Sequence, residues 1–167
     1  MWLALTGMFK ARWTEAIHSE WMRNVLLNRP DLNIEQLTRT KNLMNANIRD
    51  CLVTGYEPLI TLIELPDPDD RHVLAAAIRS GASIIVTFNL SDFPSQALKP
   101  YGVNAIHPDE FILRLIDINL VAVCTAAQRQ RRTLKNPPIT PDEYLDTLSK
   151  LGLTLSSDTL RSLCKEI

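Results

Sequence analysis

The stretch Asp-Pro-Asp-Asp-Arg-His-Val-Leu-Ala-Ala-Ala-Ile-Arg-Ser-Gly-Ala-Ser-Ile-Ile-Val-Thr-Phe-Asn-Leu-Ser-Asp-Phe, residues 67–93, decides the expected fold of this chain. It opens on acidic residues, and we expect Asp69 or Asp70 to cap a helix. The apolar face of this helix consists of Val73, Leu74, Ala77 and Ile78. Gly81 stands where a helix commonly ends in a residue with positive φ. The β-branched run 84–86 then predicts a buried strand.

Polar side chains follow this strand, and their position predicts a ligand site. A short strand that is apolar on both faces belongs inside a parallel sheet. Ligands of such sheets bind just beyond the carboxyl ends of the strands, where Thr87, Asn89 and Asp92 fall. We therefore expect an α/β fold in which the acidic start of the helix meets the polar end of the strand.

The motif D-P-D-D-x-x-V-L-A-A-A followed by I-V-T-F-N-L-x-D-F resembles the PIN-domain nucleases. In that family, an acid at the start of this helix and another just past this strand help to hold divalent metal in an active site that hydrolyses RNA. By resemblance these acids are Asp70 and Asp92. The run W-T-x-A-I-x-x-E-W, residues 13–21, resembles the segment that supplies a further acid, which makes Glu20 the third candidate.

Each of these acids also has a purely structural explanation. Asp70 could cap its helix, and Asp92 could cap the turn that follows it. Asp67 and Asp69 could be turn residues on either side of a proline. Glu20 could be a solvated helix glutamate.

The beginning of the chain departs from the family pattern. Residues 2–9 are apolar with no capping signal ahead of them, which predicts the tail of a helix. A PIN domain typically begins with a strand that ends in an Asp, and the resemblance finds no counterpart of that strand or acid here. We therefore expect an N-terminally truncated PIN-like domain over residues 1–117, with weak nuclease activity or none.

Helix signals precede the central stretch. Residues 14–27 form an amphipathic pattern with Thr14 as the candidate cap. His18 within it is interpreted as a packed or partly buried histidine rather than a catalytic base. Asn33 with Gln36 predicts the capping box of a second helix, 34–47.

Short segments around and after the central stretch complete the expected sheet. We predict strands at 51–54 and 103–106, a short helix or turn at 94–99, and a helix that begins at Pro108. Strands that alternate with helices indicate a parallel sheet flanked by helices.

Strand signals stop near Asn119, so residues 118–167 are expected to form a helical C-terminal extension. We predict helices at 119–135, from Thr140 onward with a capping box, and at 157–165. The first of these carries the densest cationic cluster, Arg129, Arg131, Arg132 and Lys135. A phosphate backbone is a natural partner for these cations, and a solvated helix end is the alternative.

The amino-acid composition limits the kinds of protein that this chain could be. The 167 residues are 46% hydrophobic, which fits a globular domain, and the net charge of −1 gives no overall attraction to nucleic acid. Cys51, Cys124 and Cys164 are few and widely spaced, as expected of free thiols in a reducing cytoplasm. No segment has the pattern of a signal peptide or a membrane span, so we expect a cytoplasmic protein.

The chemistry of RNA hydrolysis gives these residues a role. It calls for an activated water nucleophile and for screening of the phosphate charge, and carboxylate-held Mg²⁺ or Mn²⁺ can supply both. Thr87 and Asn89 could contact the substrate phosphate or bind metal through water. The resemblance implies a metal-dependent endoribonuclease, similar to the toxins of VapC-type toxin–antitoxin pairs, with RNA as substrate, an antitoxin as partner and self-association. The alternative is an inactive PIN-derived binding or regulatory protein.

Overall fold

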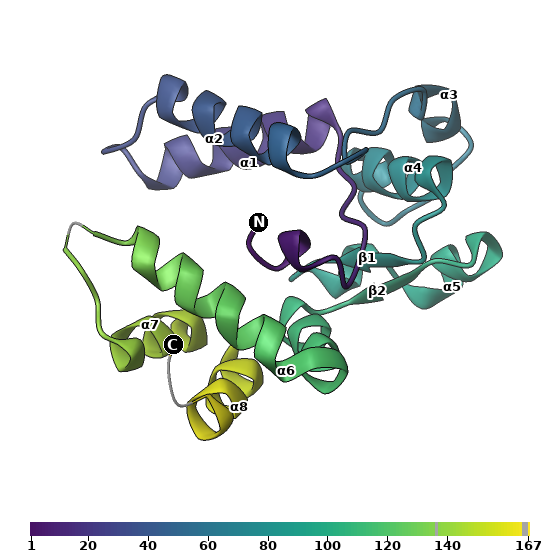
Figure 1. Cartoon of the computed structure of the whole chain (residues 1–167). Helices are drawn as coiled ribbons and strands as arrows, with labels where there is room; N and C mark the ends of the chain where they lie inside the picture. Colours follow the sequence, from purple (N-terminus) through teal and green to yellow (C-terminus); the bar gives the residue numbers. More distant parts are fainter. Residues whose placement is uncertain (136, 165–166) are drawn as a thin grey trace. The chain divides into compact units, whose positions relative to one another are not determined.

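The structure is a computed structural model that describes residues 1–135, 137–164 and 167 (Figure 1). Its helices are α1 (Glu15–Asn28), α2 (Ile34–Asn47), α3 (Glu57–Ile60), α4 (Arg71–Ser80), α5 (Ser95–Leu98), α6 (Pro108–Thr133), α7 (Pro141–Lys150) and α8 (Thr154–Leu163). Its strands are β1 (Ile84–Val86) and β2 (Asn104–Ile106), and its 3₁₀ turns are η1 (Ala4–Thr6), η2 (Pro68–Asp70), η3 (Leu90–Asp92) and η4 (Lys99–Tyr101). The predicted mixed α/β class is confirmed, with helix predominating.

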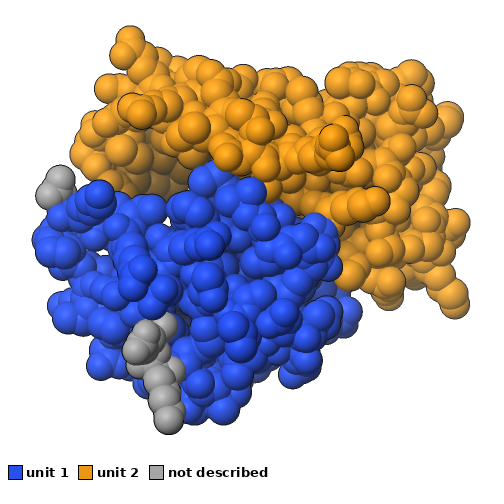
Figure 2. Space-filling view, in the orientation of Figure 1, with its two compact units in different colours: residues 1–9, 86–88, 106–167 blue, residues 10–85, 89–105 orange. Residues whose placement is uncertain are grey.

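The chain divides into two compact units, shown in Figure 2. Unit 1 comprises residues 1–9, 86–88 and 106–167, and unit 2 comprises residues 10–85 and 89–105. The predicted boundary after residue 117 falls inside α6, which lies wholly in unit 1. None of the helices in the described part of the chain is both long and apolar enough to cross a membrane.

The sheet is small and parallel. The N–H of Asn104 donates to the carbonyl of Ser83 at 2.9 Å, and the N–H of Thr87 donates to the carbonyl of Ile106 at 3.1 Å, so both strands advance in the same direction. Within the described residues β1 and β2 make up this sheet. The strand predicted at 51–54 is reduced to an isolated parallel bridge between Trp13 and Leu52.

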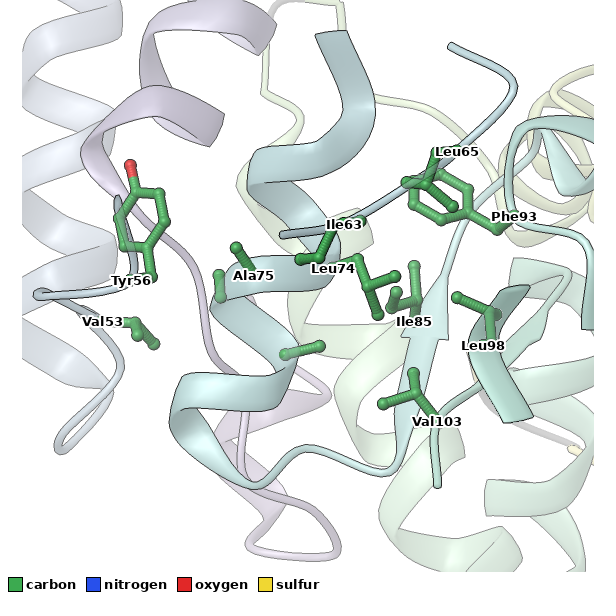
Figure 3. Close-up of a cluster of buried hydrophobic side chains, with 12 residues drawn as sticks. Val53, Tyr56, Ile63, Leu65, Leu74, Ala75, Ile85, Phe93, Leu98 and Val103 are labelled. Atoms are coloured by element: carbon green, nitrogen blue, oxygen red, sulfur yellow. The ribbon is translucent and has the colours of Figure 1, made fainter. Parts of the chain in front are cut away.

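The core of unit 2 surrounds α4 (Figure 3). Leu74 is fully buried in the middle of this helix, and Ile85 of β1 packs in the same cluster. Gly81 ends α4 with φ of 67°, as its sequence position predicts. Val86 at the end of β1 is 42% exposed, so the prediction that this strand is apolar and buried on both faces is wrong for its last residue.

A buried polar network in unit 2 joins α1 to α2. Nε1 of Trp21 donates to Nδ1 of His18 at 2.9 Å, and Nε2 of His18 lies 3.0 Å from Oδ1 of Asn45. Because Nδ1 accepts, the ring proton is on Nε2 and points to Asn45. Trp13 donates to the same Asn45 oxygen at 2.7 Å. His18 is 1% exposed and fully paired, which confirms its interpretation as a packed histidine.

The predicted helix at residues 2–9 is wrong apart from one turn. Only η1 forms there, and Gly7 ends it in the left-handed region with φ of 76°. The capped helices are confirmed: Thr14 caps α1, and capping boxes open α2 at Asn33 and α7 at Thr140.

Unit 1 is formed mainly by α6, α7 and α8. Asn119 interrupts α6 with φ of −158° and ψ of 87°, and its side chain accepts the N–H of Ala122 at 3.0 Å, so the second half of α6 has its own cap. The predicted last residue, 165, lies outside the described residues, and the last helix begins at Thr154, three residues before the predicted start. The cause is a long-range cap: the carboxylate of Asp109 accepts the N–H groups of Leu155 and Ser156.

The cysteine prediction is wrong for one pair. Cys124 of α6 and Cys164 after α8 form a disulfide, with Cα atoms 6.1 Å apart and a sequence separation of 40. Packing of α8 on α6 brings the two together, and wide sequence spacing conceals this. Cys51 is a free, buried thiol, as predicted.

Candidate metal centre

Three carboxylates of unit 2 converge at one point. Asp67, Asp70 and Asp92 each offer one oxygen, and these oxygens all lie within 4.8 Å of one another. Asp67 is exposed, whereas Asp70 and Asp92 are partly buried. Two of these acids are the predicted pair, and the third was interpreted from the sequence as a turn residue.

The turn η2 places the first two of these acids side by side. Asp67 immediately precedes η2 in extended conformation and Asp70 ends it, and their carboxylate oxygens lie within 4.8 Å of each other. Asp67 also accepts the N–H of Asp69 at 2.8 Å, which caps the turn. The side chain of Asp70 makes no capping hydrogen bond to α4, so the explanation of Asp70 as a helix cap is wrong.

Asp92 is held from its own turn. It lies at the end of η3, shortly after β1, and Nδ2 of Asn89 donates to its Oδ2. The hydroxyl of Ser91 donates to Oδ1 of Asn89 at 2.5 Å, which fixes the orientation of that amide. Asn89 therefore orients Asp92, while its predicted contact with metal or substrate stays a prediction.

Burial and crowding perturb Asp70. Burial is the largest cause that raises the pKa of this carboxyl to about 6, followed by the charges of Asp92 and Asp67, a hydrogen bond with Asp92, and the charge of Glu20. A cation among these groups would relieve the repulsion, so the cluster favours its binding. Carboxylate oxygens are the ligands preferred by Mg²⁺ and Mn²⁺, and the residues present thus fit such an ion.

Glu20 lies beside the three acids rather than among them. Its oxygens are outside the 4.8 Å group formed by the described residues, although its charge acts on Asp70. Its Oε2 lies 3.5 Å from Nε2 of His72, the second residue of α4. Sequence reasoning missed both His72 and Asp67. The three-residue spacing of Asp67 and Asp70 was a usable signal, whereas nothing in the pattern marks His72.

The remaining predicted site residues belong to unit 1. Thr87 joins the sheet through its N–H. Arg131 donates from Nε to the carbonyl of Ile167 at 2.8 Å and from Nη1 to that of Ile139 at 2.9 Å, so it fastens the C-terminal segment. Arg129 and Arg132 are exposed on α6. Contact of these four residues with substrate stays a prediction.

The acid cluster should make the stability of the metal-free chain fall as pH rises. The pKa of Asp70 is raised from 3.8 to about 6, so the folded chain binds more protons than the unfolded chain between these values. The stabilisation that comes from protonated Asp70 is complete below the unfolded pKa and is lost as pH rises through about 6. Solvent screening of this partly exposed carboxyl reduces the loss to on the order of 2 kcal/mol. Asp70→Asn should therefore be more stable than the unaltered chain at neutral pH in chelator, and the difference should vanish near pH ~4.

Thermal unfolding across this pH range measures the effect. Asp69→Asn is the matched control, because Asp69 is exposed and lies outside the cluster. A constant difference between Asp70→Asn and the unaltered chain at every pH would contradict the assigned repulsion.

Comparison with known proteins gives two matches. A family model described as the VapC50 C-terminal domain matches residues 108–162, which span most of α6, α7 and α8. A curated protein of Mycobacterium tuberculosis named "Putative ribonuclease VapC50" is 43% identical over 96 residues, which are 58% of this chain and 56% of that protein. The chain thus spans about half the length of this relative. No solved structure matches the chain significantly.

Proposed function

Because the two matches support membership of the VapC-type PIN nuclease family, we propose that this chain is a metal-dependent endoribonuclease that hydrolyses RNA phosphodiester bonds. The single observation that carries the proposal is the convergence of Asp67, Asp70 and Asp92 within 4.8 Å. The match to the relative supports ribonuclease chemistry, and the carboxylate cluster supports its dependence on a divalent ion.

Each acid of the cluster has a proposed role in metal binding. Asp67, Asp70 and Asp92 would hold Mg²⁺ or Mn²⁺, with Glu20 as an adjoining acid. An ion held there would supply activation of a water nucleophile at neutral pH and screening of the charge on the scissile phosphate. Asn89 keeps the Asp92 carboxylate oriented through its amide, and η2 keeps Asp67 and Asp70 close together.

Finer roles follow from the family. We infer that the chain is the toxin of a toxin–antitoxin pair, acts in the cytoplasm, binds an antitoxin protein and self-associates. Thr87, Asn89, Arg129, Arg131 and Arg132 are the proposed substrate contacts. The alternative is an inactive PIN-derived binding or regulatory protein.

An RNA-cleavage assay separates these functions. Single-stranded RNA should be cleaved in Mg²⁺ or Mn²⁺ and left intact in chelator, with activity restored when metal is returned in excess. Full cleavage in chelator would exclude the proposed mechanism. Binding of Mn²⁺ without any cleavage would favour the binding or regulatory role.

A further inference from the structure

We propose that His72 is a positioning residue that holds the Glu20 carboxylate beside the acid cluster for metal binding. This role rests on the proposed metal site. Nε2 of His72 lies 3.5 Å from Oε2 of Glu20. The two residues belong to different helices, α4 and α1, so the contact joins elements that are far apart in sequence.

The His72 ring extends from α4, a helix that is packed in the core of unit 2. It follows Asp70 by two residues and precedes the fully buried Leu74 by two residues in α4. Its side chain is 17% exposed, whereas that of Glu20 is 42% exposed. A partly buried ring on a core helix can therefore restrain a longer and more exposed carboxylate.

The surroundings of Nδ1 indicate which ring nitrogen of His72 carries the proton. Nδ1 of His72 is buried and has no hydrogen-bond partner in the part of the chain that the structure describes. A proton on Nδ1 would be a buried, unpaired donor, and such groups are rare and costly. A proton on Nε2 instead lies toward the carboxylate of Glu20, 3.5 Å away, so this tautomer leaves no buried donor unpaired on Nδ1.

His18 in the same unit shows what a purely structural histidine looks like. Both of its ring nitrogens are paired, to Trp21 and to Asn45. His72 has no comparable pair of partners among the described residues, and its Nε2 lies against the carboxylate of Glu20. The ring is therefore directed to the acid rather than used to join core elements.

A restraint on Glu20 would reduce the entropy that its side chain loses when a metal ion binds. Its flexible side chain loses rotamer freedom when it is held in one place, and a pre-existing contact reduces that loss upon metal binding. Residues that orient metal-binding carboxylates typically change metal affinity by about 10- to 100-fold when they are replaced. We expect the lower end of this range, because Glu20 lies outside the three-acid group.

The experiment measures Mn²⁺ binding by the full chain, from the electron paramagnetic resonance signal of free Mn²⁺. His72→Leu removes the donor and should weaken binding by about 10-fold. His72→Gln keeps an N–H near the Nε2 position and should remain within about threefold of the unaltered chain. In a Glu20→Gln background, His72→Leu should cause no further loss, because the group that it positions is already altered. Thermal unfolding in chelator reports any general effect on folding.

The outcomes distinguish this role from the proposed function. No Mn²⁺ binding by the unaltered chain would overturn the metal site and this inference together. Normal binding by the unaltered chain and by His72→Leu would overturn the positioning role alone. Equal losses by His72→Leu with and without Glu20→Gln would also overturn it, because His72 would then act independently of Glu20. If His72→Leu fails to fold, a loss by the folded His72→Gln variant as large as about 10-fold would overturn it.

Discussion

Replacing Asp70 with Asn should reduce metal-dependent RNA cleavage by more than about 100-fold, because loss of a ligand costs more than loss of the residues that orient it. Burial and the charges of Asp92, Asp67 and Glu20 raise the pKa of the Asp70 carboxyl to about 6. The amide of Asn has nearly the same shape but removes the negative charge that attracts the ion. The fold should persist, since the side chain of Asp70 does not cap α4.

Cleavage of single-stranded RNA in Mg²⁺ or Mn²⁺ measures this effect, with Mn²⁺ affinity as a second measurement. Asp69→Asn again serves as the matched control, because it removes one exposed carboxylate from the adjacent position. It should leave both quantities nearly unchanged. Equal cleavage by Asp70→Asn and the unaltered chain would exclude the proposed centre, whatever the behaviour of the control.

Replacing Asp109 with Ala should destabilise unit 1 by about 4 kcal/mol, because three hydrogen bonds to a buried charged acceptor would be lost together. Oδ1 of Asp109 accepts the N–H and the hydroxyl of Ser156 at 2.8 and 2.5 Å, and Oδ2 accepts the N–H of Leu155 at 2.9 Å. Asp109 as a whole residue is 7% exposed, so water could not readily replace its carboxylate. The unfolding temperature should fall by about 10 °C.

The pH dependence of this loss provides a further check. Burial alone would raise the pKa of Asp109, but the hydrogen bonds from Ser156 and Leu155 outweigh burial and lower it. A lowered pKa stabilises the folded chain above the unfolded value of about 3.9, and this stabilisation is lost as pH falls through the folded value. The difference between the unaltered chain and Asp109→Ala should therefore shrink in acid.

Thermal or urea unfolding of both proteins gives the comparison. Asp117→Ala is the matched control, because Asp117 is an exposed acid on the same helix. It should shift stability by no more than about 0.5 kcal/mol. An equally small shift for Asp109→Ala would show that α8 does not depend on this long-range cap.

Local sequence patterns predicted the elements that frame the site. Side chains within one turn of the backbone determine capping, so Thr14, Asn33 and Thr140 identified the starts of α1, α2 and α7. The apolar face and terminal glycine of α4 were equally clear. The positions of Asp70 and Asp92 at the start of α4 and after β1 came from family resemblance, and the structure brings their carboxylates together.

Other parts of the site could not be predicted, because their partners are distant in sequence. The local sequence pattern predicts a turn role for Asp67. Asp67 becomes the third acid of the cluster only because η3 lies close to η2 in the folded chain. From the sequence alone, His72 is an ordinary helix residue. Its contact with Glu20 exists only because α1 places Glu20 next to α4.

The sequence by itself therefore determined the mixed α/β class and the capped helices, and its family resemblance identified the two acids at the start of α4 and the end of η3. Tertiary structure decided which oxygens lie within reach of one ion, where α8 begins, and that Cys124 meets Cys164. The physical reason is the range of each interaction. A cap or an apolar stripe is complete within a few residues, whereas a carboxylate cluster, a cap donated by Asp109 and a disulfide across 40 residues exist only once separate elements have packed.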